Sequence, residues 1–123
     1  MKRNVFGLAG LIGSAALLAT SPAWAHAHLV HSNPAANATV TVAPKTITLT
    51  FNEKLVPAFS KFDLTMPEMN NMAMTVKTAV SKDGKSIVGM TPAALPKGAY
   101  KIVWTAASAD GHKMNGELAF KVG

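Results

Sequence analysis

The run from Thr46 to Phe51 constrains the fold most, because threonine alternates there with Ile47, Leu49 and Phe51. A period of two places the apolar side chains on one buried face of a β-strand and the threonines on the other. No segment of the chain has the pattern of a long amphipathic helix. The sequence therefore predicts an all-β protein.

Further short strands are predicted along the chain, with turn residues between them. Asp83-Gly84 is typical of a tight hairpin, and prolines such as Pro34 and Pro92 mark loops. About seven strands in roughly one hundred residues favour an antiparallel sandwich or a Greek-key barrel. Beside 46–51, the predicted strands are 27–32, 39–42, 60–65, 74–80, 86–90, 99–107 and 117–122.

The amino terminus has the features of a secretory leader. A basic start, Lys2-Arg3, precedes an apolar run from Val5 to Ala19, and Ala23-Trp24-Ala25 follows with small residues where a signal peptidase reads. The apolar run is short and contains glycines, which disfavours the alternative of a retained membrane anchor. We expect residues 1–25 to be removed, leaving one domain, 26–123, with no stable membrane insertion.

Composition excludes several classes of function. The chain has no cysteine, so disulfides, thiolate nucleophiles, Fe–S clusters, blue-copper centres and Cys-based zinc sites are impossible. Its net charge of +6 comes mainly from scattered lysines, because the single arginine is Arg3 in the leader. Arginine supplies most bidentate recognition of bases and phosphates, so nucleic-acid binding is not expected.

Nitrogen and oxygen ligands gather at the predicted mature terminus and in one loop. Removal of the leader makes His26 the first residue, and its α-amine and imidazole can close one chelate ring on a metal. Asp110 and His112 add a carboxylate and a second imidazole, and Gly111 frees the backbone between them. Cu(II) prefers such tetragonal nitrogen and oxygen sets, and it can displace the amine proton at neutral pH.

Two alternatives compete with this Cu(II) site. In the first, His28 is the third mature residue. A free amine, deprotonated backbone amides and this histidine could then bind Cu(II) or Ni(II) without a folded structure. Pairing of the first strand in a sheet would engage those amides and favour the folded site. The other alternative is that His26, His28 and His31 are exposed tail residues and that Asp110-Gly111 is only a turn.

Four of the chain's seven methionines lie within nine residues, at Met66, Met69, Met72 and Met74. Soft thioethers in a chain without cysteine select Cu(I). A core-facing helical stripe is one alternative, although Pro67 and Asn70-Asn71 disfavour a helix, and a Met-rich partner surface is another. The isolated Met90 and Met114 are expected to fill gaps in the core.

With these motifs, the mature chain resembles the CopC family of periplasmic copper-binding proteins along nearly its whole length. The amino-terminal start and the Asp-x-His loop are the specific part. The matching segments are His26–Val30, Asn33–Ala35, Leu49–Leu55, the methionine loop, Gly98–Trp104 and Ser108–His112. The resemblance implies a Greek-key β-barrel, cupredoxin-like or immunoglobulin-like, with Cu(II) at one end and Cu(I) at the other.

The resemblance also implies the ligands. For Cu(II) they are His26, Asp110 and His112, with Glu53 as a weak fourth ligand or a partner of a ligand. For Cu(I) they are Met66, Met69 and Met74. Two positions depart from the family pattern: Asn71 stands where many members have histidine, and Asp63 where a methionine is common. Met72 is the candidate to replace that histidine.

The function predicted from the sequence is a non-enzymatic periplasmic carrier or buffer of copper, acting in copper resistance or homeostasis. Two sites of different softness could hold both redox states and pass copper to a membrane copper transporter or another periplasmic copper protein. A copper oxygenase built on the amino-terminal histidine is the alternative. Asp110 would then occupy an open position, and the short chain leaves little room for an extended substrate face. A zinc or nickel scavenger is a weaker interpretation.

Overall fold

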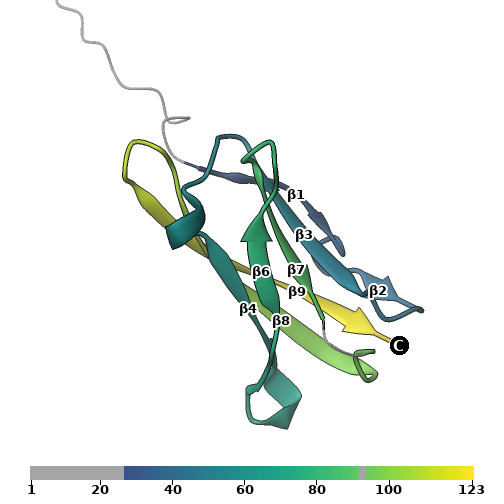
Figure 1. Cartoon of the computed structure of the whole chain (residues 1–123). Coiled ribbons are helices and arrows are strands. Elements are labelled where there is room, and N and C mark those ends of the chain that lie inside the picture. Colours follow the sequence, from purple (N-terminus) through teal and green to yellow (C-terminus); the bar gives the residue numbers. More distant parts are fainter. Residues whose placement is uncertain (1–26, 92–93) are drawn as a thin grey trace, which may run out of the picture.

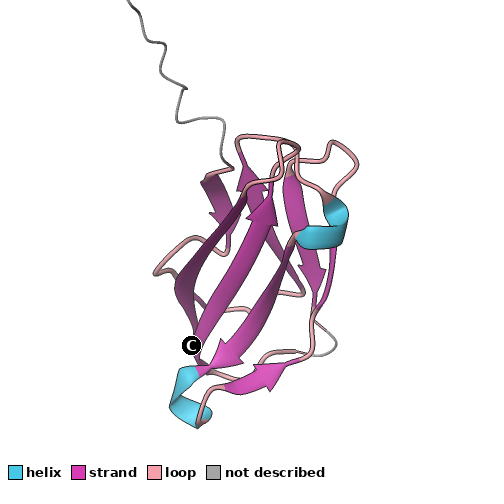
Figure 2. Ribbon diagram, turned by 90° about the vertical axis from the view of Figure 1, so that its left-hand side faces the viewer, coloured by secondary structure: helices cyan, strands magenta, loops and turns pink. Residues whose placement is uncertain are grey.

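A computed structural model describes residues 27–91 and 94–123, which form two β-sheets packed face to face (Figures 1 and 2). The first sheet contains, in order, β1 (Leu29–Asn33), β3 (Thr46–Phe51), β7 (Ser86–Met90) and β6 (Lys77–Val80). The second contains, in order, β2 (Thr39–Val40), β9 (Lys113–Val122), β8 (Gly98–Ala107), β4 (Lys61–Met66) and β5 (Met72–Met74). The predicted leader and His26 lie outside the described residues.

The all-β prediction is confirmed, and the architecture is the sandwich rather than the closed barrel, because the described strands form two separate sheets. All pairings are antiparallel except that of β2 with β9, which is parallel. The described strands are joined by loops and by two short 3-10 turns, η2 (Pro57–Phe59) and η3 (Pro67–Met69).

The core lies between the sheets and follows the predicted alternation. Ile47, Leu49 and Phe51 of β3 are at most 1% exposed, as period two requires. The Phe51 ring meets Trp104 of β8 edge to face, with centroids 5.0 Å apart, and Tyr100 stacks on a phenylalanine of β9. This packing fixes the two sheets relative to each other and so fixes the loops at both ends.

Two predicted strands differ from the structure. The segment 74–80 is divided between β5 in one sheet and β6 in the other, with a crossover after Met74. The last strand begins at Lys113 rather than at 117, because β9 pairs with β8 over its full length, from Gly98↔Val122 to Ala107↔Lys113. Tertiary pairing thus imposes extended structure on residues whose own pattern is weak.

The long strands separate the loops into two groups at opposite ends (Figure 1). The loop Ser108–His112, called here the Asp110 loop, joins β8 to β9 at one end. The segment Met66–Met74, called the methionine loop, leaves β4 at the other end, since β4 runs antiparallel to β8. With 10 residues, β8 spans about 30 Å between these ends.

Candidate metal centres

The Asp110 loop is a closed turn that brings the two predicted ligands together. The Ser108 amide donates to the carbonyl of His112 (3.0 Å), and the Gly111 amide donates to the carbonyl of Ser108 (2.9 Å). Gly111 has a φ of 92°, a left-handed conformation that glycine adopts without steric cost. Asp110 Oδ2 lies 2.9 Å from His112 Nδ1, so the two side chains predicted to approach each other across Gly111 are in direct contact.

The Asp110 carboxylate is stabilised in its ionised form. The hydroxyl of buried Ser108 donates to Oδ1, His112 contacts Oδ2 through its ring, and the His112 backbone amide donates to Oδ1 (3.1 Å). These contacts, the Ser108 bond first, hold the pKa of Asp110 well below its ordinary value. The loop therefore offers a carboxylate that ionises more readily than an ordinary aspartate.

We expect Ser108→Ala to raise the pKa of Asp110 toward its ordinary value, because the substitution removes the largest cause of the depression. A carboxyl titration of the metal-free protein by NMR measures this shift. Since the folded-state pKa is lowered, the stabilisation from ionised Asp110 is present above its unfolded-state pKa and is lost as pH falls toward the folded value. In Ser108→Ala this stabilisation should be lost at a higher pH than in the parent protein.

Ser81→Ala is the matched control, because Ser81 makes the corresponding hydrogen bond to Asp83 and lowers that carboxyl's pKa. It should shift Asp83 and leave Asp110 unchanged. An unchanged Asp110 titration in Ser108→Ala would show that the hydroxyl does not hold the carboxylate.

The chain enters the sandwich at a fixed point. Ala27 is 1% exposed within the core. The His28 amide donates to Asn52 Oδ1 (2.6 Å), and the Asn52 amide donates to the carbonyl of His28 (3.1 Å). The alternative in which Cu(II) is wrapped by backbone amides would have to break this pairing at His28. His31 lies in β1 opposite Thr50, so neither it nor His28 belongs to a loose tail.

The segment from Asn52 to Val56 connects the chain entry to the Asp110 loop. It pairs with His28 at its start, while Leu55 bridges to Ser108 and the Val56 amide donates to the carbonyl of Ala107 (2.8 Å). Glu53 lies half-buried in this segment. Within the described residues, however, no three His, Asp or Glu side chains form a group that could hold a metal. Asp110 and His112 thus supply a pair, and His26 lies outside the described residues.

The methionine loop is a tight connection between β4 and β5 and not a helical stripe. Its single 3-10 turn, η3, ends at Asn70 and Asn71, both with a φ of 56°. Cross-strand pairing sets Met72 opposite Met66, and Met74 two residues farther along β5. Directly opposed residues, and residues two apart, point to the same face of a sheet. The side chains of Met66, Met72 and Met74 therefore belong to the same face of the sheet.

Accessibility differs strongly among these methionines. Met69 and Met72 are 54% and 44% exposed, whereas Met66 is only 5% exposed and belongs to the core cluster. A Cβ placed on Gly98 would lie 3.1 Å from Met66 Cε, so the start of β8 covers this side chain. Met74 is half-buried against the core. The loop combines a packing role for Met66 with exposed thioethers beside it.

The expectation that Met90 fills the core is wrong. Its side chain is 64% exposed, because Ile87 and Gly89 take the inward positions of β7 and alternation turns Met90 outward. Met114 does pack against the core, as expected.

The sequence patterns did not indicate a role for Ser108 or Asn52. A serine two residues before an aspartate is a local signal for a hydroxyl–carboxylate bond, and it could have identified Ser108. Asn52 contacts His28 across 24 positions of sequence, and no local pattern signals such a contact.

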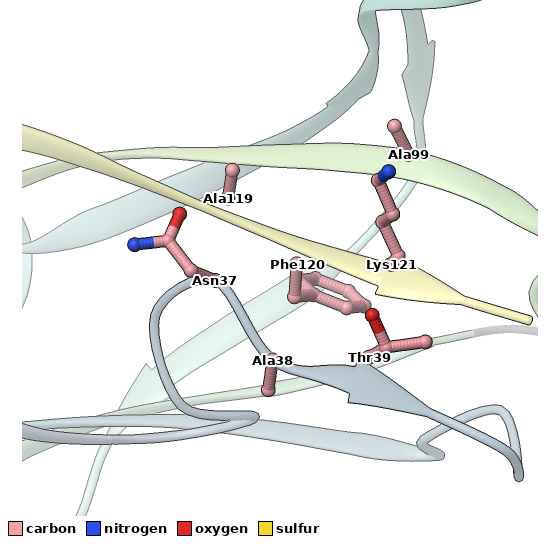
Figure 3. A pocket seen from close by; sticks show the side chains of 7 residues that line it. All are labelled: Asn37, Ala38, Thr39, Ala99, Ala119, Phe120 and Lys121. Carbon is pink, nitrogen blue, oxygen red and sulfur yellow. The ribbon is translucent and has the colours of Figure 1, made fainter.

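A cavity of about 200 Å³ lies beside β2 (Figure 3). Its lining contains no histidine, methionine or carboxylate: Asn37, Ala38, Thr39, Ala99, Ala119, Phe120 and Lys121. The cavity therefore has no typical metal ligand beyond amide and hydroxyl groups. Within 27–91 and 94–123, no helix has the length and apolar character to cross a membrane.

Comparison with known proteins gives concordant matches. The CopC domain family matches residues 29–123. Copper resistance protein C of Xanthomonas campestris pv. juglandis is 43% identical over 113 residues, covering 88% of each chain. The crystal structure of PcoC, a methionine-rich copper resistance protein from Escherichia coli, superposes with a TM-score of 0.73 at 36% identity, over 80% of this chain and 99% of that one.

A longer relative matches as well. Copper transport protein CutJ of Bacillus subtilis is 33% identical over 124 residues. The match takes in 100% of this chain but 22% of CutJ. Sequences similar to this one therefore occur both as whole proteins and as a minor part of a larger chain.

Proposed function

This chain belongs to the CopC domain family, and from that premise we propose that it is a periplasmic copper-binding protein. It carries or buffers Cu(II) and Cu(I) in copper resistance or homeostasis and is not an enzyme. One observation supports the proposal: the Asp110–His112 pair and the methionine loop lie at opposite ends of one sandwich. Their separation of about 30 Å lets each bind its ion independently.

The Cu(II) site consists of the His26 amine and imidazole, Asp110 and His112, with Glu53 as a weak ligand or a partner of a ligand. The 2.9 Å contact between Asp110 and His112 supports it, since one short loop carries a carboxylate and an imidazole side by side. The fixed entry of the chain at Ala27 and the link from Asn52 to Ser108 support the approach of the terminus to this loop.

The Cu(I) site consists of thioethers from Met66, Met69, Met72 and Met74. The common face of the three strand methionines supports it, and Met69 follows in the turn that joins the strands. Met72 stands in for the histidine that many members have, because it lies directly opposite Met66. Cu(I) tolerates the irregular geometry of such a set.

Export is part of the same proposal. Residues 1–25 act as a cleaved signal peptide that delivers the domain 26–123 to the periplasm, without stable membrane insertion. Cleavage also produces the free α-amine of His26 on which the Cu(II) chelate depends. The recipient or donor of copper is a membrane copper transporter or another periplasmic copper protein, and the match to part of CutJ, named a copper transport protein, supports a link to transport.

Metal competition tests the proposed Cu(II) centre. We expect protein beginning at His26 to take up one Cu(II) per chain in the presence of equal Zn(II) and Ni(II), measured by elemental analysis after gel filtration. His112→Ala should weaken Cu(II) binding at least about tenfold, because it removes one imidazole ligand. His31→Ala is the matched control, since this histidine is exposed on β1, and it should bind like the parent. Retention of zinc in place of copper, or equal losses in both variants, would contradict the proposal.

A further inference from the structure

An apolar protrusion stands beside the Asp110 loop. The turn η2 presents Pro57, Ala58 and Phe59 to solvent, and Phe59 is 55% exposed. Single exposed apolar residues are common on protein surfaces. Three in succession, on a turn with no buried residue, are less readily explained by packing.

The protrusion is anchored to the end of β8. On one side, the Val56 amide donates to the carbonyl of Ala107 (2.8 Å). On the other side, the Ala107 amide donates to the hydroxyl of buried Ser60 (3.1 Å). Ala107 directly precedes Ser108, so both flanks of η2 are bound to the strand end from which the Asp110 loop begins. The backbone that carries the Phe59 ring is therefore held in place, so little backbone entropy is lost on contact with a partner.

Phe59 also meets the far side of the same loop. Lys113 Nζ lies 4.9 Å from the centroid of the Phe59 ring, a cation–π contact, and Lys113 directly follows the candidate ligand His112. The protrusion thus lies against the residues on both sides of the candidate Cu(II) centre. A protein that contacted Phe59 would therefore also lie next to the Asp110 loop.

Three lysines lie next to the protrusion: exposed Lys54 and Lys61 flank η2 in the sequence, and Lys113 lies over it. Carboxylates near it in the chain include Glu53, beside Lys54, and Asp110, in the adjoining loop. An apolar tip with a cationic rim is complementary to an apolar recess with carboxylates around it. Three lysines are fewer than the clusters of roughly four to eight that are typical of anionic lipid binding.

We propose that Phe59 and Lys113 form a docking surface for a copper-exchanging partner protein, which meets the Asp110 end with an apolar recess rimmed by carboxylates. This inference rests on the proposed function and adds to it the surface through which Cu(II) is handed over. Aromatic residues with a fixed backbone are frequent anchors of protein interfaces.

Site-specific photo-cross-linking tests the surface in the intact protein. A photoreactive phenylalanine analogue at position 59 should give one discrete heterodimer in copper-grown cells of the producing bacterium. The same analogue at Val42, which is 78% exposed and distant in the fold, is the matched control. The cross-linked protein is then identified by mass spectrometry, purified, and titrated with this chain.

We expect Phe59→Ser and Lys113→Gln to weaken that complex at least about tenfold, as truncation of an interface anchor does. The Cu(II) affinity of both variants should equal that of the parent, which separates docking from copper binding. If the unsubstituted protein itself fails to bind Cu(II), the proposed function is refuted instead. Four results would each overturn the docking proposal. Two concern the cross-link: equal yields from positions 59 and 42, or a product that contains two copies of this chain. The others are Phe59-dependent flotation of the protein with phosphatidylglycerol vesicles, and variants that bind the partner with an affinity within twofold of the parent's.

Discussion

One extra residue in front of His26 is expected to weaken Cu(II) binding by about 100-fold and to leave Cu(I) binding unchanged. The addition converts the α-amine into a peptide nitrogen, which has no available lone pair, so the chelate ring with the imidazole is lost. The imidazoles and the Asp110 carboxylate can still bind the ion, but without the added affinity of a chelate ring. Competition against a chromophoric chelator measures both affinities, for protein beginning at His26 and for protein beginning with an added glycine.

The fold should tolerate this extension. Ala27 is buried and His28 pairs with Asn52, so the sandwich is established from Ala27 onward. Equal thermal unfolding midpoints for the two metal-free forms provide the control. Equal Cu(II) affinities of the two forms would show that the α-amine is not a ligand. The proposed chelate beside the Asp110 loop would then be wrong.

Replacing the four methionines of the methionine loop with leucine is expected to abolish Cu(I) uptake and to spare Cu(II). Leucine conserves volume at the buried position 66, where the stability cost should stay below about 1.5 kcal/mol. It supplies no sulfur, and the loop offers no other soft ligand. A Cu(I)-specific chromophoric chelator measures the loss. The Cu(II) site, about 30 Å away along β8, should not respond.

Met90 and Met114 provide the matched control for this experiment. Both lie outside the methionine loop, one exposed and one against the core, and their joint replacement with leucine should leave Cu(I) binding intact. Tight Cu(I) binding by the fourfold variant would show that the sulfurs serve packing only. Within the loop, single substitutions at Met66, Met72 and Met74 should cost more than one at Met69, since these three share a sheet face.

The crossover between the sheets could not be predicted from periodicity. From 74 to 80 the even-numbered residues are half-buried and the odd-numbered ones exposed, without interruption. The chain keeps the same residues turned inward while it passes from β5 in one sheet to β6 in the other. Alternation indicates which side chains of a strand are buried, but it does not indicate to which sheet the strand belongs. In contrast, the clear alternation of 46–51 predicted β3 without error in its bounds.

The features of the candidate sites likewise differ in whether they arise from neighbouring residues or from residues far apart in the sequence. The convergence of Asp110 and His112 depends on one glycine between them, so the sequence alone could predict it. The approach of the chain entry to that loop depends on Asn52 and Leu55, whose partners are far along the chain. The position of Phe59 against Lys113 has the same origin, because it requires η2 and β9 to be adjacent in space.

Anomalous diffraction at the copper absorption edge tests the central claim most directly. Crystals of protein beginning at His26 are loaded with Cu(II) in one set and with Cu(I) under reducing conditions in another. We expect one oxidised peak beside Asp110 and His112, and one reduced peak among the methionine sulfurs at the opposite end, about 30 Å away. A single shared position for both oxidation states, or an oxidised peak remote from His112, would contradict the account.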